Sequence, residues 1–144
     1  MVRIKERARA TDMSEEVNLS GAWKGIFAYP RSLPPNQFDA ELRDHGGILT
    51  GETFEQGNTP RTRGQPLHAM IEGNRNGCHV HFVKRYDAFR RAATPVFYSG
   101  RLSEDGSEIS GIWEIPKHWA GTFLMVRARS KGAGAERKIA ETVR

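Results

Sequence analysis

The 144-residue sequence has a single cysteine, Cys78, and no long apolar run. One cysteine excludes an internal disulfide, so we expect a reducing compartment. No stretch approaches the roughly 18 consecutive apolar residues that a membrane-spanning helix needs. Residues 1–7 lack the apolar core of a signal peptide. We therefore expect a soluble, cytoplasmic protein with no membrane association.

The sequence also lacks the motifs that mark common catalytic sites. It contains no phosphate-cradling glycine loop, no G-x-S-x-G and no H-E-x-x-H. His79 and His81 share one strand face, as zinc ligands can, with Glu72 and His68 expected on the same exterior surface. That surface is solvated, and Cys78 is expected inside as a small apolar group. We therefore expect a non-enzymatic protein without metal or cofactor, although acid–base catalysis inside a cavity stays open.

A uniform excess of charge is missing as well, despite a net charge of +5. Residues 1–17 hold four basic and four acidic side chains, whereas residues 127–144 hold six basic and two acidic ones. The middle of the chain is therefore almost neutral. We divide the chain into a polar extension (1–17), a single domain (18–128) and a basic tail (129–144) that is flexible or weakly helical.

Alternating apolar residues between turn residues are abundant, and they predict strands rather than helices. Eight such runs lie at 19–29, 37–44, 48–56, 67–73, 78–86, 95–102, 108–115 and 120–127. Glycines inside the runs permit the strong coiling that closes a small barrel. We predict an all-β fold, an eight-stranded antiparallel up-and-down β-barrel.

The connections between these runs alternate between short and long, which gives the barrel two unlike ends. Short turns, such as the one at Asn76-Gly77, close one end. The long connections gather at the other end and form a mouth. Five basic residues of these connections form the predicted rim: Arg61, Arg63, Arg90, Arg91 and Lys117.

The run Leu19-Ser20-Gly21-Ala22-Trp23 resembles the G-x-W signature of the calycin first strand. The calycin superfamily joins lipocalins, fatty-acid-binding proteins and avidins. The resemblance implies a barrel whose closed end is plugged by Trp23, with Arg127 of the last strand packed across it. The strand layout is most similar to avidins, but the polar first-strand positions that hold biotin are absent. The run Gly21-x-Trp23-x-Gly25-x-x-x-Tyr29-Pro30 resembles the first strand of nitrobindin-type haem barrels, which keeps haem as a minor alternative.

The mouth end of the predicted interior combines aromatic walls with a few polar groups, as small-molecule sites do. Its expected members are Tyr29, Phe38, Thr53, Lys84, Tyr86, Tyr98, Trp113 and Trp119. An inward lysine is costly unless it meets water, an acid or an anionic ligand. Lys84 could therefore bind an anionic head group, pair with Glu55 if that residue points inward, or reach solvent at the rim.

Two functions follow from this pattern. The preferred prediction is a barrel that binds an apolar small molecule with an anionic head group at its open end. The alternative is a packed barrel that binds a protein or nucleic acid through its basic loops and tail. Outward apolar residues on the sixth, seventh, eighth and first strands also predict a homodimer interface. These residues are Phe97, Ile112, Leu124, Val126, Ile26 and Ala22.

Overall fold

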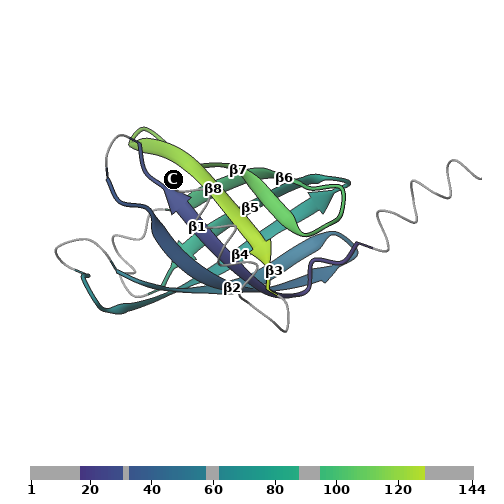
Figure 1. The fold of residues 1–144 in the computed structure, drawn as a ribbon, viewed down its shortest axis with the longest axis horizontal. Coiled ribbons are helices and arrows are strands. Elements are labelled where there is room, and N and C mark those ends of the chain that lie inside the picture. Colours follow the sequence, from purple (N-terminus) through teal and green to yellow (C-terminus); the bar gives the residue numbers. More distant parts are fainter. Residues whose placement is uncertain (1–16, 31–32, 58–61, 88–94, 129–144) are drawn as a thin grey trace, which may run out of the picture.

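The protein is a closed antiparallel barrel of eight strands. The computed structural model describes residues 17–30, 33–57, 62–87 and 95–128. The strands are β1 (Gly21–Ala28), β2 (Asn36–His45), β3 (Ile48–Gln56), β4 (Pro66–Asn76), β5 (His79–Tyr86), β6 (Val96–Leu102), β7 (Glu108–Ile115) and β8 (Trp119–Arg127). Each strand pairs with the next, and β8 pairs with β1 to close the barrel (Figure 1). The predicted up-and-down barrel is confirmed. No helix in the described ranges is long and apolar enough to cross a membrane.

The fourth strand is longer than predicted, and this moves the following hairpin. β4 runs on to Asn76, which pairs with His79, so the two-residue loop is Gly77-Cys78 rather than Asn76-Gly77. Gly77 has a φ of 63°, which suits glycine at the first central position of a tight hairpin turn. Cys78 is consequently a half-buried turn residue and not the first residue of a strand.

The barrel interior is filled by large side chains, many of them aromatic. The rings of Phe82 and Tyr98 stack at 4.7 Å between centroids, and Phe123 meets Tyr98 edge-on at 4.9 Å. Gly25 allows the ring of Phe38 to lie against the β1 backbone, since a Cβ there would come within 2.2 Å of that ring. The middle of the barrel is therefore a packed core, as the small diameter of an eight-stranded barrel allows.

The closed end is covered by Trp23 and Arg127. The guanidinium carbon of Arg127 lies 4.7 Å from the Trp23 ring centroid, within the range of a cation–π contact. Arg127 also donates hydrogen bonds to the carbonyls of Asn18 (2.9 Å) and Ser20 (3.2 Å). The last strand is thereby fixed to the segment that leads into the first.

A buried acid at this end was missed in the strand pattern. Asp44 accepts hydrogen bonds from the backbone N–H of Leu19 and of Gly47, and pairs with Arg75 Nε at 3.0 Å. Burial alone would raise the pKa of Asp44, but these hydrogen bonds and the Arg75 charge overcome it and lower the pKa below its ordinary value. Asp44 thus connects the N-terminal lead-in with two hairpins.

The outer face of β6, β7, β8 and β1 differs from the open apolar patch predicted for it. Ile26, Leu124 and Val126 form a second buried cluster and are each at most 8% exposed. Phe97 and Ile112 are 43% and 54% exposed. Ala22 of β1 is exposed as well, so the large exposed apolar side chains of the predicted patch are those of β6 and β7. The N-terminal extension up to residue 16 and the tail from residue 129 lie outside the described residues.

Candidate functional site

The interior just below the mouth is organised around Lys84 of β5. This side chain is fully buried, so it does not reach solvent at the rim. Its ammonium group lies 4.9 Å from the ring centroid of Phe27, 4.8 Å from Phe38, 4.8 Å from Tyr86 and 5.7 Å from Tyr98. We call these four rings and Lys84 the lysine cage. Ring faces attract a cation, most strongly when water is excluded.

Glu55 of β3 supplies the counter-charge, because the strand's alternation turns it inward. Its Oε1 accepts hydrogen bonds from Lys84 Nζ (2.8 Å) and from the Tyr86 hydroxyl (3.0 Å). The other oxygen, Oε2, accepts one from Asn36 Nδ2 at 3.0 Å. One carboxylate therefore connects the cage with the rim.

Electrostatics in the cage follow from burial. Burial lowers the pKa of Lys84, and the Glu55 carboxylate opposes that shift because it favours the ammonium form. Burial, followed by the charge on Glu55, raises the pKa of both Tyr86 and Tyr98. Both phenols therefore stay protonated at neutral pH, and the Tyr86 hydroxyl donates its hydrogen bond to Glu55.

A second group of aromatic rings lies at the mouth itself. Tyr29 stacks on Trp119 at 4.9 Å, and Trp113 meets both rings nearly at right angles. Phe27 contacts Tyr29 and Trp113 and also faces Lys84, so it joins this group to the lysine cage. Trp119 is 38% exposed, which makes it the most accessible ring of the group.

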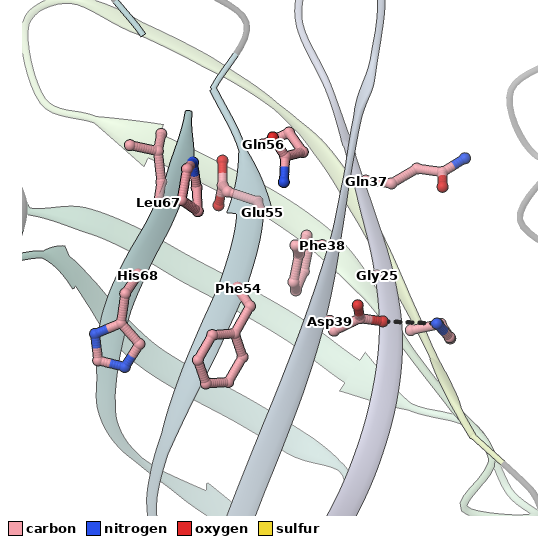
Figure 2. Close-up of a pocket in the computed structure, with 11 residues that line it drawn as sticks. Gly25, Gln37, Phe38, Asp39, Phe54, Glu55, Gln56, Leu67 and His68 are labelled. Carbon is pink, nitrogen blue, oxygen red and sulfur yellow. Dashed lines mark ion pairs between the residues drawn. The ribbon is translucent and has the colours of Figure 1, made fainter. Parts of the chain in front are cut away.

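A groove of about 800 Å³ runs beside the mouth across β1 to β4 (Figure 2). Outward side chains such as Phe54 and His68 form its outer part. Phe38, Glu55 and Leu67, which point inward, form its other part. The groove therefore reaches Glu55, whose side chain is itself only 3% exposed.

Thr53 carries an unsatisfied polar group near this site. It is 1% exposed, and its hydroxyl has no hydrogen-bond partner. It lies two residues from Glu55 on the same face of β3, between Ala40 and Ala69 of the neighbouring strands. A buried hydroxyl without a partner costs free energy, so Thr53 is a candidate hydrogen-bonding group of this end of the barrel.

The predicted site residues thus fall into two groups that share one end of the barrel. Phe38, Thr53, Lys84, Tyr86 and Tyr98 lie in or beside the lysine cage; Tyr29, Trp113 and Trp119 lie at the mouth. Of the predicted rim, Arg63 and Lys117 are exposed, whereas Arg61, Arg90 and Arg91 lie outside the described residues. Phe27 and Asn36 were not predicted. The alternation of the first strand predicts Phe27 inside the barrel but does not mark it as a site residue, and only the fold shows Asn36.

The histidines considered as zinc ligands are not arranged as a set. His79 and His81 are exposed on β5, and Glu72 pairs across the sheet with Val83. His68 instead contacts Glu52 at 3.3 Å and Asp87 at 2.5 Å. Within the described ranges, no group of three His, Cys, Asp or Glu side chains could hold a metal ion.

Comparison with known proteins supports the architecture. The chain is similar to the solved structure of a redesigned β-barrel, with a TM-score of 0.62 and 12% identity over 84% of this chain and 96% of that one. No protein-family model and no curated protein matches the sequence. At such low identity the likeness shows a shared barrel fold alone.

Proposed function

We propose that this protein is a non-enzymatic, calycin-like barrel that binds an apolar small molecule with an anionic head group at its open end. The observation that carries the proposal is a fully buried lysine inside the mouth, enclosed by four aromatic rings. Burying such a charge pair seldom stabilises a fold more than apolar side chains of similar volume would. A role in recognition accounts for its presence, and a cytoplasmic location fits the single cysteine.

The surroundings of Lys84 match the two parts of such a ligand. The mouth rings Tyr29, Trp113 and Trp119 offer an apolar wall. Lys84, Tyr86 and the unsatisfied hydroxyl of Thr53 offer donors below that wall. Exposed Arg63 and Lys117 add positive charge at the rim, which attracts anions.

Competition between decanoate and decanol for a fluorescent probe tests this function. We expect decanoate to displace 8-anilinonaphthalene-1-sulfonate more effectively than decanol does. The double variant Lys84→Met with Glu55→Gln leaves no charge in the cage, and we expect it to bind the two compounds equally. Arg85→Met, on the outer face of the same strand, should behave as wild type. Equal binding by the wild type would contradict the anionic preference.

One observation favours the alternative function. Phe82, Tyr98 and Phe123 fill the middle of the barrel, so a ligand could enter only the mouth end. If neither compound binds and native mass spectrometry finds no co-purified molecule, a surface role through the basic loops and tail is favoured. RNA gel shifts that weaken strongly between low and physiological salt would then support nucleic-acid binding.

We also propose that the partner on the outer face is a second copy of this chain. Phe97 of β6 lies opposite Glu114 of β7, Ser99 opposite Ile112, and Arg101 opposite Ser110. A two-fold axis through the middle of this face would place Glu114 of each copy against Arg101 of the other. Ile112 would lie between those two ion pairs and Phe97 beside Glu114, so that the same patch of both copies forms the contact, as in a two-fold interface.

A further inference from the structure

Glu55 stands between Lys84 and the space from which a ligand would arrive. Glu55 is one of the residues that line the groove, together with Phe38 and Leu67 (Figure 2), but its side chain is only 3% exposed, and its Oε1 accepts a hydrogen bond from Lys84 Nζ at 2.8 Å. The Lys84 ammonium is therefore already paired with a carboxylate. An incoming anion can reach the same donors only if the Glu55 carboxylate leaves them.

The two carboxylate oxygens of Glu55 have different partners, so the side chain has a second position in which it could be held. Oε1 serves the interior donors Lys84 and Tyr86, whereas Oε2 is bound by Asn36 near the rim. Asn36 is half-buried, so the structure is more open on its side of Glu55. Rotation toward that side would return the carboxylate to water, where an ion is well solvated.

The hydrogen-bond donors that Glu55 would leave are suited to a ligand carboxylate. Lys84 supplies one positive charge and Tyr86 one hydroxyl donor, and Thr53 has a buried hydroxyl without a partner. A ligand carboxylate would replace the Glu55 carboxylate charge for charge. An alcohol would leave the buried ammonium unpaired, and a phosphate monoester would bring additional buried charge.

We propose that Glu55 is an internal carboxylate that competes with the ligand for Lys84, and that an amphiphilic monocarboxylate displaces it. This inference rests on the proposed function and adds the ligand class and a specificity-determining residue. The internal competitor lowers affinity for every anion. It does not affect a neutral amphiphile that stays in the mouth.

Isothermal titration with decanoate, decanol and decyl phosphate tests the exchange. In Glu55→Gln the competitor loses its charge, and we expect decanoate to bind about tenfold more tightly, a difference of about 1.4 kcal/mol. The affinity of Glu55→Gln for decanol should stay within about twofold of the wild-type affinity. We expect decyl phosphate to bind more weakly than decanoate. Glu41→Gln, an exposed acid on the outer face of β2, is the matched control.

A measurement on the wild type keeps the test independent of whether Glu55→Gln folds. Nitrogen-15 NMR of the Asn36 side-chain amide reports on Glu55, because that amide donates to Oε2. We expect decanoate, but not decanol, to shift this signal. If the wild type prefers decanoate while the Asn36 signal stays fixed, or while Glu55→Gln fails to gain affinity, the exchange is wrong and the binding function stands. If neither wild type nor Glu55→Gln binds any of the three compounds, the proposed function itself fails.

Discussion

Asp44 is a single residue on which much of the closed end depends. Its carboxylate accepts two backbone N–H groups and pairs with Arg75, whose side chain is only 5% exposed. Removing one partner of a buried ion pair costs far more than removing an exposed one, because a charge or donor stays buried without compensation. Removing one partner of an exposed ion pair on the outside of the barrel should therefore lower the stability much less.

We predict that Asp44→Asn lowers the free energy of unfolding by about 3 kcal/mol at neutral pH. Asp39→Asn, which breaks the exposed pair with Lys24, should lower it by less than about 1 kcal/mol. Denaturant unfolding followed by tryptophan fluorescence measures both. Equal losses in the two variants would contradict the role given to burial.

The pH dependence of the free energy of unfolding provides a separate test of the role of Asp44. Its pKa in the folded state is lowered, so its stabilising contribution is present above the unfolded-state pKa and is lost as pH falls through the folded-state pKa. The difference between wild type and Asp44→Asn should therefore be full at neutral pH and shrink below about pH 4. A difference independent of pH would show that the ionised form is not what stabilises this end.

At the scale of elements, His68 connects β3, β4 and the start of the connection after β5. Its ring lies between Glu52 and Asp87, and the Asp87 N–H donates to the His68 carbonyl at 3.1 Å. The hydrogen bond to Asp87 raises the pKa of His68 against the opposing effect of burial, and the charge on Asp87 and the contact with Glu52 add to the rise. The protonated ring is therefore the form that holds the three segments together.

We predict that this contact stabilises the fold at acidic and not at basic pH. A raised folded-state pKa gives stability that is full below the unfolded-state value of about 6.5 and is lost as pH rises through the folded-state pKa. Urea unfolding of wild type and His68→Gln should therefore differ most near pH 5.5 and least near pH 8.5. His81→Gln, exposed on β5, should show no such trend.

The elements themselves were largely predictable, whereas the polar contacts between them were not. The alternation in residues 48–56 predicts Leu49, Gly51 and Thr53 inward, with Ile48 and Phe54 as competitors for the inner face. The structure buries the first three and exposes the other two, because period-two burial is a local property of a strand. The Lys84–Glu55 pair joins strands 29 residues apart in the sequence. No local pattern fixes such a partner, since it depends on the register across two strand pairings.

Two further residues show where local patterns fail. Asp44 continues the inward alternation of β2. An acid at that position nevertheless predicts the end of a strand, unless the backbone N–H groups that donate hydrogen bonds to it are known. Ile26 lies on the outer face but is 3% exposed, so parity predicted its direction and not its environment. Side-chain direction follows from the strand; burial depends on the whole chain.

At the scale of the whole molecule, the exposed residues of β6 and β7 carry the proposed dimer. We predict that Phe97→Glu shifts the protein from dimer to monomer in sedimentation velocity. Phe54→Glu changes a similarly exposed ring on β3 and should leave the dimer intact. A monomeric wild type at high protein concentration would remove the proposal.

Charge reversal tests the orientation of the two copies. In the proposed arrangement Arg101 of one copy faces Glu114 of the other, so Arg101→Glu and Glu114→Arg should each weaken the dimer. Combining both reversals in one chain should restore it, because each interfacial pair again joins opposite charges. Failure of the double variant to recover would exclude this axis while leaving other dimers open.

The attachment of Arg127 to Asn18 and Ser20 has a consequence for how the molecule can be displayed. The described chain enters and leaves the barrel at the plugged end, near Asn18 and Arg127, so a carrier joined directly to the described chain there would be attached opposite the mouth. The protein could be immobilised upright on a sensor surface or repeated in tandem, with every opening accessible to solvent. The connections at the mouth could then be varied as a library without altering the end that holds the barrel shut.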